Sequence, residues 1–155
     1  EVSDIDTLKD FENNTCVHLL YVHSSPRLLS LEPLRKNTTI VTLFVESCPN
    51  ISDLSIFETN TTIAQVIIRH CDVKDISPLK HNRTIGYLDL SNNPIGDISP
   101  LWGNPNLIFF EFGPRTTVDF RQQKRIYDSV ATNRLNYASR KTSLRHLSHS
   151  HITNS

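Results

Sequence analysis

The chain has 155 residues, of which 37% are hydrophobic and 21% charged, as in an ordinary globular domain. No run of 18 or more apolar residues occurs, which excludes a membrane-spanning helix as the basis of the fold. The formal net charge is zero, but residues 1–113 have eight Lys/Arg against fourteen Asp/Glu, whereas residues 114–155 have eight against two. This asymmetry predicts two parts with different surroundings or partners and a boundary near Gly113-Pro114.

In chain order, the first recognisable segment is residues 2–8. Its sequence, Val-Ser-Asp-Ile-Asp-Thr-Leu, matches residues 73–79, Val-Lys-Asp-Ile-Ser-Pro-Leu. Residues 73–79 form the second half of a repeat. We therefore expect a repeat array that begins in mid-repeat, either as part of a longer array or as a divergent cap.

The repeat is visible as Asn-Thr-Thr-Ile at residues 37–40 and 60–63 and as Asn-Arg-Thr-Ile at residues 82–85, at spacings of 23 and 22. Asn14 and Asn104 continue the same phase, which gives five registers. Self-similarity at such a period is the signature of a solenoid.

Six apolar columns repeat within these registers with the spacing L-x-x-L-x-L and then three further positions. The strand columns are Val17, Ile40, Ile63, Ile85, Leu107; Leu20, Leu43, Val66, Leu88, Phe110; and Val22, Val45, Ile68, Leu90, Phe112. The returning half contributes Leu28, Ile51, Val73, Ile95; Leu31, Leu54, Ile76, Ile98; and Leu34, Phe57, Leu79, Leu101.

Residues 88–101, Leu-Asp-Leu-Ser-Asn-Asn-Pro-Ile-Gly-Asp-Ile-Ser-Pro-Leu, resemble the leucine-rich repeat, most closely the 22-residue subclass of bacterial internalins and a protein-phosphatase regulatory subunit. The resemblance covers residues 1–113 and implies an α/β solenoid with parallel strands on its concave face and short 3-10 or irregular segments on its convex face. Residues 114–139 are expected to form a capping helix that contacts the array through Phe120, Tyr127, Val130 and Leu135. Residues 140–155 are expected to be a basic, disordered tail.

The cysteines Cys48 and Cys71 fall on the column where such repeats place Asn or Cys, shared by Asn93 and Ser25. This position is predicted to satisfy backbone N–H groups in the turn that leaves the strand, with a disulfide as the less favoured alternative. Cys16 lies outside the column. The recurring aspartates Asp53, Asp75 and Asp97, with Asp4 placed in an equivalent slot, are interpreted as turn residues.

Five Asn residues head an Asn-x-Ser/Thr triplet, the acceptor motif for N-glycosylation. They are Asn13, Asn37, Asn50, Asn60 and Asn82. Turn chemistry explains the same residues equally simply, because Asn tolerates tight turns and Thr favours the strand that follows.

Because side chains alternate along a strand, the residues between the core positions are expected to face outward on the concave side. Tyr21, Phe44 and Ile67 would then form an exposed apolar strip that Asp89 and Glu111 continue as an acidic patch. Ordinary strand packing is the competing interpretation. The full set of candidate binding residues is Tyr21, Phe44, Ile67, Asp89, Glu111, Tyr87 and Arg69, and Glu46 is expected to pair with Arg69.

No catalytic residues, metal site or cofactor are predicted, because the sequence has neither a Gly-rich phosphate loop nor a recognisable nucleophile motif. His146, His149 and His151 on the tail are a weak metal-binding candidate.

The predicted function is therefore a non-enzymatic protein-binding module, with an extracellular or cell-surface location favoured slightly over a cytoplasmic one. An intracellular scaffold or regulatory subunit is the alternative. The basic tail suits an acidic surface, whereas nucleic acid is a less favoured partner.

Overall fold

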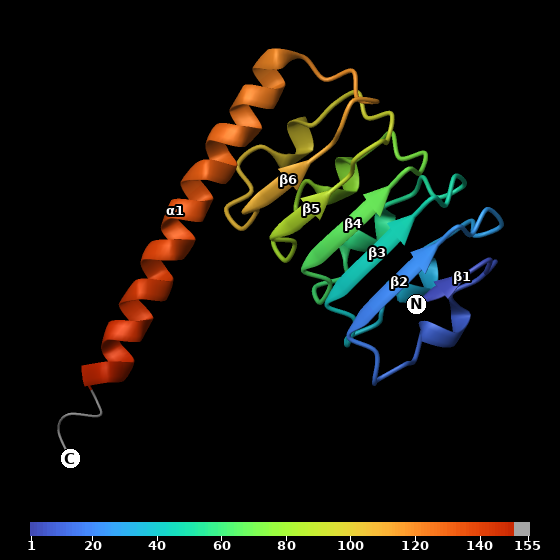
Figure 1. Ribbon diagram of the computed structural model, residues 1–155, viewed down its shortest axis with the longest axis horizontal. Coiled ribbons are helices and arrows are strands. Elements are labelled where there is room, and N and C mark those ends of the chain that lie inside the picture. Colours follow the sequence, from blue (N-terminus) through green and yellow to red (C-terminus); the bar gives the residue numbers. More distant parts are fainter. Residues whose placement is uncertain (151–155) are drawn as a thin grey trace.

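The computed structural model describes the backbone of residues 1–150 and the side chains of residues 1–141. Six parallel strands of this part form one sheet in sequence order, each joined to the next by a single short 3-10 turn (Figure 1). The strands are β1 (Val2–Ser3), β2 (Leu19–His23), β3 (Thr42–Glu46), β4 (Gln65–Arg69), β5 (Tyr87–Asp89) and β6 (Phe109–Glu111). The 3-10 turns are Lys9–Phe11, Glu32–Leu34, Ser55–Glu58, Ser77–Leu79 and Ser99–Leu101. The predicted solenoid, with strands on one face and 3-10 turns on the other, is confirmed.

The apolar columns form one continuous core between the sheet and the 3-10 turns. The strand positions predicted to point inward are buried in each repeat from β2 to β6, except for the partly buried Val17, and the three columns of the returning half are buried as well. Strand register explains this regularity, because Leu20 pairs with Leu43, Leu43 with Val66, and Val66 with Leu88. Each repeat therefore buries its leucines against the next repeat rather than within itself.

Each of the turns after β1 to β5 contains one residue in the left-handed backbone region. These residues are Asp4, Ser24, Ser47, His70 and Asn92, with φ between 48° and 61°. The residue that follows, from the second turn onward, is the predicted ladder position: Ser25, Cys48, Cys71 and Asn93 are buried. Ser25 Oγ accepts the Ile5 N–H and Asn93 Oδ1 accepts the Val73 N–H, as predicted. The two thiols instead donate to the strand carbonyls of Glu46 and Arg69.

The cysteines are unpaired: Cys48 and Cys71 are buried free thiols and Cys16 is an exposed one. Burial raises the pKa of the Cys71 thiol to about 12 and moves the pKa of Cys48 in the same direction. Both ladder thiols therefore stay protonated at physiological pH and behave as small core residues.

A second polar ladder runs through the turns that lead into the strands, and it is made of the Asn residues that mark the repeat. In each of Asn14, Asn37, Asn60, Asn82 and Asn104, the side-chain oxygen accepts the backbone N–H groups two and three residues later. The side-chain nitrogen of the last four donates to carbonyls of the preceding repeat. The Asn60 amide, for example, reaches Leu34 and Asn37. The repeat period thus follows a buried hydrogen-bond chain as well as the leucines.

The predicted match between residues 2–8 and 73–79 is wrong. Val2 lies in β1 and pairs with Val22, so it occupies a strand position. Leu8 precedes a 3-10 turn as Leu31 and Leu54 do, whereas Leu79 ends one. The first turn is shorter than the others. Residues 2–8 have no preceding repeat to fix their alignment, so their short apolar pattern matched the wrong half of a repeat as well as the right one.

The C-terminal helix α1 (Phe120–Ser150) packs along β6 and covers that end of the core (Figure 1). Among its side chains up to residue 141, Ile126 and the predicted Val130 are buried, whereas Phe120 and Leu135, also predicted to make this contact, are 76% and 71% exposed. Tyr127 is partly covered through its ring contact with Phe112. The predicted set was drawn from a loose periodicity that could not fix which stripe of the helix faces the array.

Polar contacts complete the attachment of α1. Asn133 Nδ2 donates to the Asn104 and Leu107 carbonyls, both at 2.8 Å, and so adds another amide to the Asn ladder. The Arg125 guanidinium lies 3.9 Å from the centre of the Trp102 ring. Asp119 caps the helix start by accepting the Gln122 N–H.

The helix also continues through residues 140–150, where the sequence predicts a disordered tail. No Pro or Gly follows Pro114, so nothing in this segment interrupts helical hydrogen bonding. His146, His149 and His151 lie outside the residues whose side chains are described. The prediction for residues 151–155 lies outside the described residues altogether.

We expect Asn60→Ala to destabilise the array by about 2–4 kcal/mol, because it leaves buried carbonyls and N–H groups without partners. Urea unfolding followed by circular dichroism measures this loss. Thr61→Ala, at the adjacent exposed position, is the matched control and should change stability by no more than about 0.5 kcal/mol. Equal effects of the two substitutions would contradict a stabilising role for the Asn ladder.

Candidate functional site

The concave face of the sheet carries the candidate binding residues in three lateral columns. Strand register places Tyr21 beside Phe44, Phe44 beside Ile67, and Ile67 beside Asp89, which pairs in turn with Glu111. The predicted middle column is therefore assembled in the predicted order. Its exposure differs from the prediction in two places.

Ile67 and Asp89 are buried on this face, with 4% and 2% of their surface exposed. Ile67 therefore does not extend an exposed apolar strip, and Asp89 does not start an acidic patch. Sequence alternation gives the face on which a side chain lies, but not how far its neighbours cover it. The centre of the concave face is closed.

The reason for the burial of Asp89 is its ion pair with Arg69 of β4. Arg69 donates from Nε at 2.9 Å and from a terminal nitrogen to the same carboxylate oxygen, and the Ser91 N–H donates to the other at 3.0 Å. The predicted Glu46–Arg69 pair is wrong, because Asp89 lies on the other side of Arg69 and offers a more enclosed carboxylate. Arg69 and Asp89 thus neutralise each other within the face.

The pKa of Asp89 reflects two opposing effects. Burial acts to raise it, but the hydrogen bonds from Arg69 and Ser91, together with the positive charge of Arg69, outweigh burial and hold the pKa below its ordinary value. The ionised carboxylate is therefore the form that the folded protein prefers.

Two aromatic pairs flank this closed centre. On β2 and β3, Tyr21 and Phe44 meet edge to face with ring centres 5.7 Å apart, and both are partly exposed. On β5 and β6, Tyr87 and Phe109 stack with ring centres 4.1 Å apart. Phe109 was not among the predicted site residues. The register that aligns it with Tyr87 was available from the repeat, but its contact with Tyr87 was not.

The C-terminal pair is joined by a residue of α1. The Arg134 guanidinium lies 5.8 Å from the centre of the Phe109 ring, and its Nε donates to the Ile108 carbonyl. Arg134 therefore places a cation at the edge of the concave face. Nothing in the repeat pattern could identify it, because it lies outside the array.

The N-terminal pair carries an acidic group. Tyr21 Oη donates to Glu46 Oε2 at 2.8 Å. This hydrogen bond, with smaller contributions from burial and the carboxylate charges, raises the pKa of the Tyr21 phenol. Beside Tyr21, the His23 ring lies 5.2 Å away and its Nε2 is 2.9 Å from Glu1 Oε1.

His23 Nδ1 also lies 3.4 Å from Ser24 Oγ, so that Ser24, His23 and Glu1 form a series of side-chain contacts in the order Ser–His–Glu. The Ser–His distance is long for proton transfer, and Glu1 is 66% exposed. This arrangement does not form a hydrolytic site.

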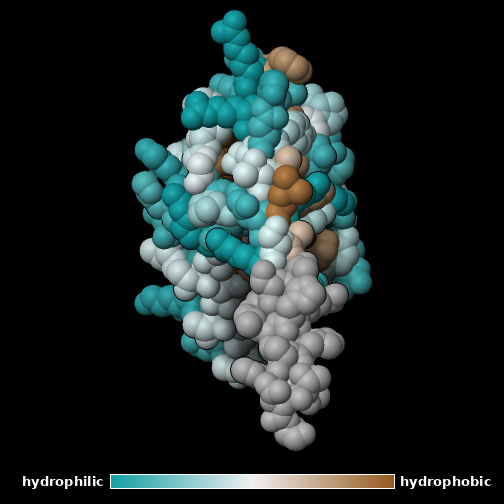
Figure 2. All heavy atoms as spheres, turned by 90° about the vertical axis from the view of Figure 1, so that its left-hand side faces the viewer, coloured by the Kyte–Doolittle hydropathy of each residue, from teal (hydrophilic) through white to brown (hydrophobic). Residues whose placement is uncertain are grey.

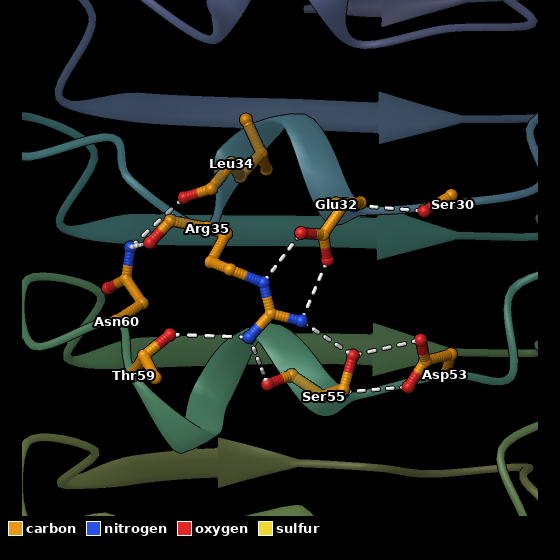
Figure 3. A network of polar contacts seen from close by, with 8 residues as sticks. All are labelled: Ser30, Glu32, Leu34, Arg35, Asp53, Ser55, Thr59 and Asn60. Carbon is orange, nitrogen blue, oxygen red and sulfur yellow. Dashed lines mark hydrogen bonds and ion pairs between the residues drawn. The ribbon is translucent and has the colours of Figure 1, made fainter.

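The convex side has a groove of about 480 Å³ beside Lys9, Leu29 and Pro33. Arg35 borders it, but all its N–H groups are engaged: it donates to both Glu32 oxygens, to the Ser55 carbonyl and hydroxyl, and to Thr59 (Figure 3). The hydrogen bonding between Glu32 and Arg35 lowers the pKa of Glu32 and raises that of Arg35. The network joins two neighbouring repeats and leaves no Arg35 N–H for a ligand.

The recurring aspartates are turn residues, as predicted, but Asp4 is not in an equivalent slot, because it occupies the left-handed position of the first turn. Asp53, Asp75 and Asp97 each accept the backbone N–H and the hydroxyl of the serine two residues later. No three His, Cys, Asp or Glu side chains come together as a metal site in the part of the chain searched, residues 1–141. Within the same part, no helix has the length and hydropathy needed to cross a membrane.

The glycosylation triplets fall into two groups. Asn37, Asn60 and Asn82 are buried, and their side-chain nitrogens donate within the Asn ladder. Asn13 and Asn50 are exposed, with Asn50 Nδ2 donating to the Pro26 carbonyl. The sequence motif alone could not separate the two groups.

The side of the molecule that carries α1 is mostly hydrophilic, with small separate hydrophobic spots (Figure 2). Its exposed apolar residues include Phe120, Leu135 and Tyr137. The aromatic pairs of the concave face are the better candidate for protein recognition, because their rings are fixed on strands.

No protein-family model matches the sequence, and a search of curated proteins gave no match. The fold is nevertheless similar to solved structures of two internalins from Listeria monocytogenes. An internalin superposes with a TM-score of 0.69 at 20% identity over 80% of this chain, and internalin C2 with 0.63 at 20% identity over 74%. This chain spans 37% and 50% of their respective lengths. The fold is therefore a leucine-rich-repeat solenoid.

We expect the contribution of Asp89 to stability to depend on pH. Since its folded pKa lies below the unfolded value of about 3.9, its stabilisation is complete above that value and is lost as pH falls through the folded pKa. Asp89→Asn should therefore lower the free energy of unfolding at pH 7 by about 1–3 kcal/mol and by less near pH 3. Urea unfolding at both values tests this, with the exposed Glu58→Gln as control. A pH-independent difference between wild type and Asp89→Asn would be the contrary result.

Proposed function

We propose that this chain is a non-enzymatic protein-binding module whose concave face holds a protein ligand. The observation that supports the proposal most directly is the presence of two partly exposed aromatic pairs, Tyr21–Phe44 and Tyr87–Phe109, on one continuous sheet. Aromatic side chains dominate the energetics of protein interfaces, and rigid strands fix them at little entropic cost. The internalin-like fold is consistent with this role.

A protein ligand can lie across the centre of the concave face, but that part of the face is not expected to contribute most of the affinity. Arg69 and Asp89 already satisfy each other, and Ile67 is covered. A ligand that spans the face would therefore gain most by contacting the two aromatic pairs, with Glu111 and Arg134 at the α1 end. Contacts concentrated in a few aromatic groups are typical of protein recognition.

Photo-cross-linking tests which face binds. Benzoylphenylalanine in place of Phe44 on the concave face should cross-link a protein partner in extracts of the source cells or their surroundings. The same residue in place of Leu29, which is 68% exposed beside the convex groove, should not. For the partner so identified, the double variant Tyr87→Ala, Phe109→Ala should raise Kd at least about tenfold in calorimetry, since hot-spot aromatics contribute 2 kcal/mol or more. Leu29→Ala is the matched control. Cross-links at position 29 and none at 44 would reject the concave face.

We further propose a secreted or cell-surface setting, in which Asn13 and Asn50 carry N-linked glycans. Glycans are restricted to these two residues in this proposal. The exposure of Asn13 and Asn50 and the burial of Asn37, Asn60 and Asn82 support the restriction, because a glycan occupies the amide nitrogen and needs a path to solvent. Intact mass of natively expressed protein before and after glycosidase treatment should differ, and Asn13→Gln with Asn50→Gln should abolish the difference. Glycan at Asn60 in folded protein would contradict the restriction. Unmodified protein would favour the alternative, an intracellular scaffold or regulatory subunit.

A further inference from the structure

Glu46 is a partly buried carboxylate on the concave face without a cationic partner. Its Oε2 accepts the Tyr21 hydroxyl at 2.8 Å, and its lateral neighbour Arg69 donates to Asp89 instead. Among the residues whose side chains are described, no Lys, Arg or His forms an ion pair with Glu46. A carboxylate in such a position gains from a cation that comes from outside the chain.

Two aromatic rings lie beside this carboxylate. The Tyr21 and Phe44 rings meet edge to face, and both side chains are partly exposed. The raised pKa of Tyr21 keeps its phenol neutral and able to donate to Glu46. Aromatic faces attract cations through their electron density, and a neighbouring carboxylate adds a charge-assisted hydrogen bond.

The surrounding charges favour the same kind of ligand. Glu1 lies beside His23 at the edge of the Tyr21 ring. Residues 1–113 have fourteen acidic against eight basic side chains. Arg69, the neighbour of Glu46 on β4, forms an ion pair with Asp89. A positively charged group approaching Glu46 therefore meets an attractive field.

We propose that Tyr21, Phe44 and Glu46 form a subsite for an arginine side chain of the protein ligand. The inference rests on the proposed function, since it gives the chemistry that one part of the concave face recognises. A planar guanidinium can lie on a ring and direct its N–H groups to the Glu46 carboxylate at the same time, whereas a compact ammonium makes one of these contacts less well.

The subsite can be tested with N-acetyl-arginine amide as probe, followed by nuclear magnetic resonance of the full chain. We expect saturable shifts at Tyr21, Phe44 and Glu46 with a Kd of about 1–10 mM, as suits one charged contact on an open surface. N-acetyl-lysine amide should bind more weakly, and uncharged N-acetyl-glutamine amide should cause no saturable shift there.

Glu46→Gln keeps the shape of the side chain and should weaken the probe at least about fivefold. Glu58→Gln, at an exposed position of the convex 3-10 turns, is the matched control and should bind as wild type does. Circular dichroism verifies that both variants are folded. The subsite is overturned if the wild type gives no saturable shift, if Glu46→Gln binds equally well, or if the shifts lie elsewhere.

The probe needs no protein partner, so the two proposals can fail separately. Binding of the arginine probe without concave cross-links would reject the protein-binding function alone. Concave cross-links without probe binding would reject the arginine subsite alone.

Discussion

The structure depends on how its coils satisfy their backbone polar groups where the chain turns into each strand. These turns lie against the core, and a buried N–H or carbonyl without a partner costs about as much as several well-made hydrogen bonds contribute. An Asn side chain solves the problem because it accepts and donates at once. Its oxygen holds its own turn, and its nitrogen reaches the repeat before it, as Asn60 does with Asn37. The leucines form the hydrophobic core, whereas the Asn amides fix the position of each coil relative to the coil before it.

This arrangement explains why the concave face can carry function. Once the core and both ladders hold the strands in register, the outward side chains are free to vary without loss of fold. Along one face the chain places an acidic aromatic group at Tyr21 and Glu46, a closed centre at Asp89, and an aromatic stack beside Arg134. The two ends of the face therefore differ in charge while sharing aromatic character. A ligand that contacts both ends would be oriented by that difference.

Much of the fold could be predicted from the sequence, because six apolar columns in one period leave few alternatives. Lateral neighbours such as Tyr21 and Phe44 followed from the same period. What a period cannot give is the conformation of long side chains: Arg69 could reach either Glu46 or Asp89, and only packing decides. The phase of the first turn was predicted wrongly because the turn is short. The buried face of α1 was predicted only in part, because its weak periodicity identified Val130 but not Ile126. The same Asn residues served both as a glycosylation motif and as a ladder, which burial alone separates.

The attachment of α1 has a consequence for how such a chain can be built. Asn133 donates to the Asn104 carbonyl, and Asn104 donates to the Asn82 carbonyl. The helix therefore presents to the last coil the same amide that another coil would present. A cap of this kind recognises a feature common to every coil rather than one unique to the last. Whole coils could then be inserted or removed ahead of it, and the length of the concave surface could change while its closure stayed the same.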